Sequence, residues 1–186
     1  MAGCMAHARR KFYQAREQKP GVANFILCHI AALYRVEASL RKRKAGPVLR
    51  EAARAAASRA ILDRLGRALT ILKPRFLPQS NMGKAIAYSL SIWPSLQVYL
   101  TAGRVEIDNN LVENAIRPSA IGKKNWLFIG HPDAGQRSAI IYSIVVSCQR
   151  RKIDPLLYLR DVLTRLPAMT TRDDLDALTP ANWKPT

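Results

Sequence analysis

The stretch IDNNLVENAIRP, residues 107–118, concentrates more local chemistry than any other part of the sequence. Asn110 is a favoured helix N-cap residue, and Glu113 follows three residues later, which is the spacing of a capping box. Arg117 lies four residues after Glu113, so on a helix both side chains share one face. Pro118 predicts the end of that helix. The spacing alone favours a short, well-capped helix with an internal ion pair over an acidic active-site residue held at a helix N-terminus.

The charge of the chain indicates a polyanionic partner. The 186 residues include 30 lysines and arginines against 13 acidic residues, and the net charge of +17 is spread over the whole length. Nucleic acid is the first candidate partner and an anionic membrane surface is the second. A basic protein without such a partner is the remaining alternative. The length suffices for one domain with a hydrophobic core, or for part of a larger one.

The three cysteines predict no disulfide framework. Cys4, Cys28 and Cys148 are odd in number and widely spaced, which favours a reducing compartment. Cys4-x-x-His7 has the spacing of two metal ligands, but no second pair completes a set of four. We therefore interpret Cys4 and His7 as ordinary helix residues.

No membrane segment is expected. The sequence shows no apolar signal-peptide core at its start. No charge occurs between Lys84 and Arg104, and this span is long enough to cross a bilayer. Its serines, a glutamine and Pro94 dilute its hydrophobicity, so a buried helix is the better interpretation.

Hydrophobic periodicity and the positions of proline and glycine predict a mostly helical chain. The clearest long helix spans residues 48–73, and five arginines lie on its other sides, as a solvated face or a nucleic-acid track: Arg50, Arg54, Arg59, Arg64 and Arg67. Residues 126–129 are expected to form a small strand or extended turn. The segment 136–151 is apolar nearly all round, which predicts a buried helix. The other expected helices are residues 6–17, 22–44, 81–101 with a kink or restart at Pro94, and 155–167.

Helix starts are predicted at two further places. Ser80 or Asn81 is suited to cap the helix that follows it. Asp154 followed by Pro155 combines a favoured cap with a favoured first helical residue.

Specific strings resemble one known family. They are GCMAHARRKF at residues 3–12, EIDNN at 106–110 with Glu113 and IRP at 116–118, GKKNWLF at 122–128, AIIYS at 139–143, Asp154-Pro155, and YLRDVL at 158–163. In this order they resemble the DDE-type transposases of the IS66 insertion-sequence family. Together the strings span essentially the whole chain, which makes the joint resemblance specific.

The resemblance implies a fold class and a division of the chain. The expected fold is mainly α, namely the C-terminal fragment of an RNase-H-like α/β catalytic core with a helical insertion and a C-terminal helical segment. Residues 1–20 would end one core segment, residues 21–104 would form the insertion, residues 105–134 would carry the last catalytic acid, and residues 135–186 would form the C-terminal helical segment.

The resemblance also implies site residues and partners. Such enzymes cut and join DNA with two Asp and one Glu that hold two divalent metals, Mg²⁺ or Mn²⁺. Glu113 would be the last catalytic acid and a metal ligand. The implied location is the bacterial cytoplasm, in association with the nucleoid. The residues suited to phosphate contact are Arg117, Lys123, Lys124, Arg9, Arg10 and Lys11.

The sequence departs from the family pattern in one respect that bears on chemistry. In the family both catalytic Asp residues, and a cysteine-paired segment resembling a zinc finger, precede the string found here at residues 3–12. We therefore expect a truncated and catalytically incomplete form that does not cut or join DNA alone. An incomplete core should expose apolar side chains such as Ile140, Val145 and Phe128. Their exposure would either require a partner, for example a full-length transposase, or make the chain aggregate.

Three hypotheses about function remain open. The chain is a transposase or its C-terminal part, or it is a non-enzymatic basic helical module that binds DNA or regulates the enzyme. The third is a general basic protein associated with RNA or membranes. The net charge fits all three, and the joined strings favour the first.

Overall fold

The computed structural model of the chain describes residues 2–126, 130–170 and 172–185, apart from the side chain of Lys124. The chain divides into two compact units, Met1–Glu113 and Asn114–Thr186. The described residues form helices and turns and no strand. The expectation of a mainly helical chain is therefore confirmed, whereas the expected RNase-H-like α/β core is not.

The segments expected to contribute to that core contain helices and no strand among their described residues. Residues 1–20 contain helix α1 (Met5–Ala15), and residues 105–134 contain the whole of helix α7 (Asn110–Trp126). Trp126, expected to begin a small strand or extended turn, is the last residue of α7, and residues 127–129 lie outside the described part of the chain.

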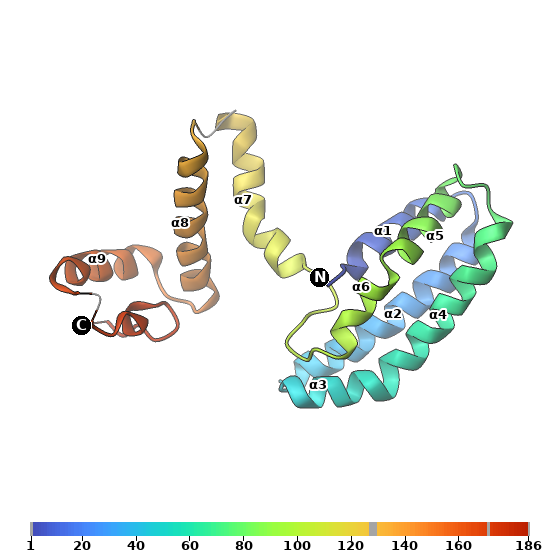
Figure 1. Ribbon diagram of the computed structural model, residues 1–186, viewed down its shortest axis with the longest axis horizontal. Helices are drawn as coiled ribbons and strands as arrows, with labels where there is room; N and C mark the ends of the chain where they lie inside the picture. The colour runs from blue at the N-terminus through green and yellow to red at the C-terminus, as the bar shows by residue number, and fades with distance from the viewer. Residues whose placement is uncertain (1, 127–129, 171, 186) are drawn as a thin grey trace. The chain divides into compact units, whose positions relative to one another are not determined.

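Unit 1 is built on four helices whose neighbours pack in a ring. Helix α1 packs against α2 (Pro20–Lys42) and α5 (Asn81–Ser91), and α4 (Arg59–Leu72) packs against α2 and α5 (Figure 1). The shorter elements of the unit are α3 (Pro47–Ala53), the π-helical turn η1 (Arg54–Ser58), η2 (Lys73–Arg75), α6 (Trp93–Gln97) and η3 (Val98–Leu100).

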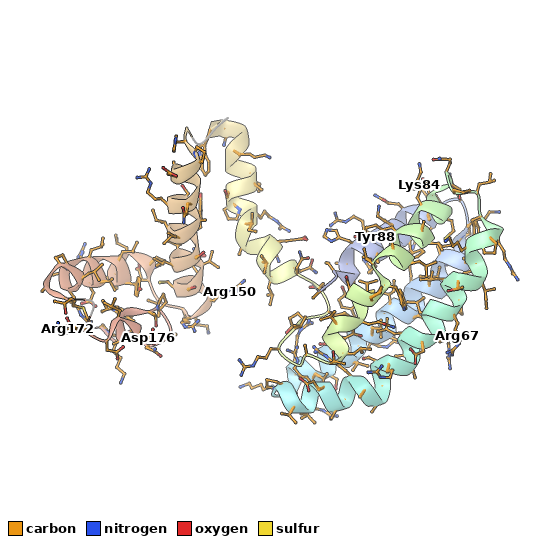
Figure 2. All side chains as sticks on the ribbon, viewed as in Figure 1. Arg67, Lys84, Tyr88, Arg150, Arg172 and Asp176 are labelled. Carbon is orange, nitrogen blue, oxygen red and sulfur yellow. The ribbon has the colours of Figure 1, made fainter. Side chains whose placement is uncertain are left out.

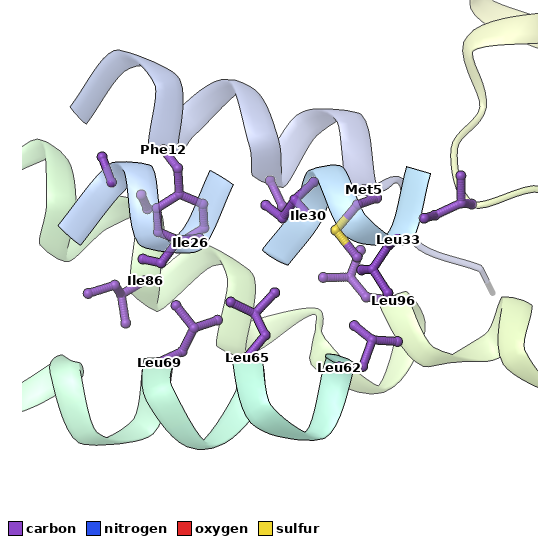
Figure 3. Packing of buried hydrophobic residues seen from close by; sticks show 14 of the residues in the cluster. Met5, Phe12, Ile26, Ile30, Leu33, Leu62, Leu65, Leu69, Ile86 and Leu96 are labelled. Carbon is purple, nitrogen blue, oxygen red and sulfur yellow. The ribbon is translucent and has the colours of Figure 1, made fainter. Parts of the chain in front are cut away.

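The core of unit 1 follows from helical periodicity. Buried residues recur at three- and four-residue steps, so each helix presents one apolar face to the centre. Figure 3 shows these side chains meeting between the helices. The buried set includes Met5, Ala8, Phe12 and Ala15 on α1, Ala23, Ile26, Ile30 and Leu33 on α2, Leu62, Leu65 and Leu69 on α4, and Met82, Ala85 and Ile86 on α5.

A buried ion pair joins α2 to the π-helical turn. Glu37 and Arg54 both have 0% exposed surface. Arg54 donates to both carboxylate oxygens of Glu37 at 2.8 Å, and to the carbonyl oxygens of Tyr99 at 2.8 Å and Ala102 at 3.2 Å. The expectation that all arginines of residues 48–73 lie on a solvated side is therefore wrong for Arg54, although Arg59, Arg64 and Arg67 are exposed.

The helix starts agree with expectation where a cap is well formed. Ser80 caps α5, because its hydroxyl oxygen accepts from the Gly83 N–H at 3.0 Å. The helix expected over residues 81–101 restarts near Pro94, as α6 after α5. Gly103 lies in a turn after these elements, where an added Cβ would stand 2.0 Å from the carbonyl oxygen of Pro47.

Unit 2 contains the rest of α7, α8 (Pro132–Arg150), α9 (Pro155–Arg165), η4 (Leu166–Ala168) and η5 (Leu175–Leu178). Asp154 caps α9 as expected, accepting from the Leu156 N–H at 2.8 Å. The Tyr158 hydroxyl donates to the Leu178 carbonyl at 2.7 Å and ties α9 to η5.

Two expectations in unit 2 are wrong. Helix α7 does not end at Pro118 but continues through it to Trp126. Helix α8 is not buried all round, since Ile140 and Ile141 are 55% and 58% exposed within the described chain. The exposure of Ile140 agrees with the separate expectation that this apolar side chain would be exposed. Val145 is half-buried, and Phe128 lies outside the described residues.

Candidate functional site

Glu113 lies in the first turn of α7 and closes unit 1. Its N–H donates to the Asn109 carbonyl at 2.9 Å, and the Asp108 carboxylate accepts from the Asn110 N–H at 3.1 Å. Asn110 is thus the first helical residue and not the cap, so the predicted capping box is wrong. The Glu113 side chain is directed elsewhere, since its Oε1 lies 3.3 Å from Nε2 of His7.

The loop before α7 is anchored at three successive residues. Glu106 accepts from Arg41 at 2.8 Å and from Arg50 at 2.7 Å. Ile107 is 2% exposed and its carbonyl accepts from the Met5 N–H at 3.1 Å. Asp108 accepts from the Tyr34 hydroxyl at 2.7 Å. These contacts fix the start of α7 against unit 1 and so position Glu113.

Burial and ion pairing act in opposite directions on Glu106. Burial disfavours its charged form, but the hydrogen bonds and positive charges of Arg41 and Arg50 outweigh this and lower the pKa of Glu106 below its ordinary value. For Tyr34, burial raises the pKa, and the neighbouring Asp108 raises it further. Tyr34 therefore stays a neutral hydroxyl that can donate to Asp108 at any ordinary pH.

Cys4 and His7 meet Glu113 at this point. Cys4 is the residue before α1, and the backbone on both sides of it is held: the Gly3 N–H donates to Ser95 at 2.8 Å and the Met5 N–H to Ile107 at 3.1 Å. The ligand atoms of Cys4, His7 and Glu113 all lie within 4.8 Å of one another. The interpretation of Cys4 and His7 as ordinary helix residues missed this cluster, because its third member is remote in sequence.

This donor set does not fit the metal pair that the family resemblance implies. Two-metal phosphoryl transfer uses hard cations that take oxygen ligands. The cluster offers one carboxylate, one imidazole and one thiol. The nearest acid along the chain, Asp108, is engaged by Tyr34 and by the Asn110 N–H. Within the described residues, the cluster around Glu113 therefore contains a single carboxylate.

A basic hollow lies on the same segments of unit 1. It has a volume of about 440 Å³ and is lined by Ala6, Arg9, Arg10, Tyr13, Tyr34 and Asn110. Arg9 and Arg10 are exposed. Guanidinium groups beside aromatic rings suit a phosphate backbone, because arginine binds phosphate oxygens in a bidentate manner and ring faces stack on bases.

The other residues predicted to bind DNA are distributed more widely. Lys11 is half-buried, and its Nζ lies 4.6 Å from the ring centre of Tyr88 on α5, whose position Figure 2 shows. Arg117 and Lys123 are exposed on the part of α7 that belongs to unit 2. Lys124 lies on the same helix, and its side chain is not described. Trp126, the last residue of this helix, is 52% exposed.

None of the helices in the described part of the chain is long and apolar enough to cross a membrane. The uncharged span between Lys84 and Arg104 instead forms α5, α6 and η3, and supplies several side chains to the core of unit 1.

Comparison with known proteins identifies relatives along the whole chain. Residues 1–137 match the family model described as the transposase IS66 family, and residues 143–181 match the model described as the IS66 C-terminal element. Two similar proteins of Sinorhizobium fredii (strain NBRC 101917 / NGR234) are named uncharacterized protein y4jD, 34% identical over 99% of this chain, and uncharacterized protein y4qI, 36% identical over 100% of it.

The chain is much shorter than these relatives. It spans 36% of the length of the first and 34% of the second. No solved structure matches the chain.

Proposed function

Because the chain belongs to the IS66 transposase family, we propose that it acts in DNA transposition by binding DNA and by supplying Glu113 to an acidic active site. Family membership implies a function related to transposition. The DNA contact and the role of Glu113 are the proposal. Binding to DNA would also place the protein with the bacterial nucleoid.

The observation that carries the proposal is the position of the basic hollow. Arg9, Arg10 and Tyr13 follow His7 on α1, and Asn110 precedes Glu113 on α7. A phosphate backbone bound by the two arginines would therefore lie on the same two segments as the acid. Arg117, Lys123 and Lys124 add positive charge further along α7 for non-specific contact with DNA.

The proposed site is incomplete in this chain by itself. In transposases that this family resembles, divalent metal ions held by several carboxylates supply the charge stabilisation for strand cutting and joining. The described cluster has a single carboxylate, so we expect no cleavage or strand transfer from the purified chain with Mg²⁺ or Mn²⁺. Metal-dependent nicking of a transposon-end duplex by the chain, absent from the Glu113→Gln variant, would contradict this.

DNA binding can be tested with two matched double variants. Arg9→Ala/Arg10→Ala removes two charges from the hollow. Arg64→Ala/Arg67→Ala removes two charges from exposed positions of α4, on which Figure 2 labels Arg67. If the hollow binds two phosphates, the slope of log K against log salt should fall by about 2 in the first variant only.

Two other outcomes of this comparison would contradict a role for the hollow. Equal losses in the two variants would show that overall charge, and not the hollow, determines binding. A larger loss in the α4 variant would support the alternative nucleic-acid track along residues 48–73.

A second candidate function is a non-enzymatic module that binds DNA or regulates a full-length transposase. The single carboxylate of the described cluster favours it. The two functions predict different results when the chain is mixed with a full-length transposase whose own last catalytic acid has been replaced. Restored strand transfer that requires Glu113 supports the catalytic role, and inhibition independent of Glu113 supports the regulatory one.

A further inference from the structure

We propose that Cys4, His7 and Glu113 form a binding site for one transition-metal ion of the Zn²⁺ class. The three side chains come from the start of α1 and the first turn of α7, and their ligand atoms all lie within 4.8 Å of one another. The site is distinct in chemistry from the Mg²⁺ or Mn²⁺ pair implied by the family, although it uses the same Glu113.

The distances suit a tetrahedral ion. Nε2 of His7 and Oε1 of Glu113 are 3.3 Å apart. Two ligands bound at about 2.0 Å in a tetrahedron are separated by about 3.3 Å, so this pair already spans one tetrahedral edge. The Cys4 sulfur lies within 4.8 Å of both atoms, a gap that a rotation of its short side chain can close.

The ligand types select the metal. Thiolate and imidazole favour Zn²⁺ and related ions over Mg²⁺, which prefers carboxylate, carbonyl and water oxygens. Three protein ligands with one position open to water form a known zinc arrangement. His7 and Glu113 are each 39% exposed at their side chains, which leaves an open side for a fourth ligand.

The backbone around the cluster is held before any metal binds. Hydrogen bonds at Gly3 and Met5 fix both neighbours of Cys4. Gly3 lies so close to α6 that an added Cβ would stand 3.1 Å from backbone atoms of Ser95 and Leu96. Ligands carried on such fixed elements lose less freedom on binding, which favours affinity.

A bound ion would lie between His7 and Glu113 and be coordinated by Cys4 as well. It would cross-link the start of α1 to a residue more than a hundred positions later, and mass action would stabilise unit 1.

The test uses the full chain after removal of metals with a chelator. One sample is titrated with Zn²⁺ in competition with a chromophoric chelator, and another with Co²⁺ while its absorption spectrum is recorded. The variants are Cys4→Ser, His7→Gln and Glu113→Gln. The matched control is Cys28→Ser, which removes an exposed free thiol from α2. Circular dichroism verifies that each variant is folded.

We expect one Zn²⁺ per chain, a thiolate-to-cobalt charge-transfer band, and a rise in melting temperature with Zn²⁺. Cys4→Ser should lose the charge-transfer band. Each of the three ligand variants should bind Zn²⁺ at least about tenfold more weakly, because a loss of that size is already typical when a residue that only hydrogen-bonds to a metal ligand is replaced. Cys28→Ser should behave like the wild type.

Equal Zn²⁺ affinity in Cys4→Ser and wild type would overturn the proposal, as would Mg²⁺ displacing Zn²⁺ at similar concentration. If a variant unfolds, the charge-transfer band in the wild type and its retention in Cys28→Ser still decide the matter. DNA binding measured without metal is unaffected by any of these outcomes, so failure here is separable from failure of the proposed function.

Discussion

Arg54 and Glu37 form an ion pair in the interior of unit 1. Both are fully buried, and Arg54 donates four hydrogen bonds within the unit. Arg54→Ala would leave the Glu37 carboxylate buried, with Arg50 at 3.5 Å as its remaining cationic partner. We expect a loss of about 3–5 kcal/mol in the free energy of unfolding, measured by denaturant titration.

The control for this prediction is Arg59→Ala, which removes an exposed arginine from the same helical run. A surface substitution of this kind should change the free energy of unfolding by no more than about 0.5 kcal/mol. Equal effects of the two variants would contradict the account of the buried pair.

Glu106 makes the stability of unit 1 depend on pH. Its pKa in the folded protein lies below the ordinary value of 4.5, because Arg41 and Arg50 outweigh the effect of burial. A carboxyl with a lowered folded pKa stabilises the protein above its unfolded pKa, and this stabilisation is lost as the pH falls through the folded pKa.

The measurement is the difference in free energy of unfolding between the wild type and Glu106→Gln as a function of pH. We expect the wild type to be more stable at neutral pH and the difference to shrink as the pH falls below about 4.5. Background carboxyls contribute equally to both proteins. A difference that stays constant down to about pH 3 would show that Glu106 does not carry this dependence.

At the residue scale, the assignment of Glu113 as a site residue rests on the family resemblance and stays a prediction. The sequence did not predict that Cys4 and His7 lie beside Glu113, because their proximity depends on the packing of α1 against the loop before α7. The burial of Arg54 also could not be predicted from the α-helical periodicity of the sequence. Residues 48–73 are not one regular α-helix, and the π-helical turn brings Arg54, Ser58 and Leu62 to the same side in four-residue steps.

At the scale of elements, the end of α2 carries a conformational cost. Lys44 follows the helix with φ 50°, a left-handed conformation that side chains other than glycine adopt at a cost. The Ala45 N–H donates to the Leu40 carbonyl at 3.0 Å and closes the helix end. Lys44→Gly should therefore stabilise unit 1 by about 0.5–1 kcal/mol, measured by thermal or denaturant unfolding.

Lys42→Gly is the matched comparison, because Lys42 is exposed in the last turn of α2 and has helical geometry. Glycine there should destabilise the unit by about 1 kcal/mol. If both substitutions destabilise the protein alike, the backbone at Lys44 is not the source of the cost.

Helix existence was predictable from the sequence, and helix boundaries less so. The prediction that α7 ends at Pro118 failed because a proline removes one hydrogen bond and does not by itself end a helix whose flanking turns continue. The prediction that α8 is buried failed for another reason. Apolar composition indicates that burial of a helix surface would be favourable. It does not show whether other residues of the described chain bury that surface.

At the scale of the whole molecule, the sequence predicted the family and the mainly helical fold, but not the arrangement of the helices. The mainly helical fold and the IS66 resemblance are confirmed. The strands expected from the resemblance are absent from the described residues, which form two helical units. Periodicity predicts the apolar face of each of the four helices in unit 1. It does not predict which faces pack against each other, and the ring depends on that pairing.

The central claim is that this chain, with its net charge of +17, binds DNA. The salt dependence of DNA binding tests this claim most directly. The affinity of the wild-type chain for a DNA duplex is measured by fluorescence anisotropy over a series of salt concentrations. If about five phosphates are contacted, log K should fall linearly with log salt, with a slope of about −4 to −5. Glu113→Gln should leave this slope unchanged, since Glu113 is proposed to act in chemistry and not in charge neutralisation. A flat response to salt in the wild type would contradict the claim that this chain binds DNA through its basic residues.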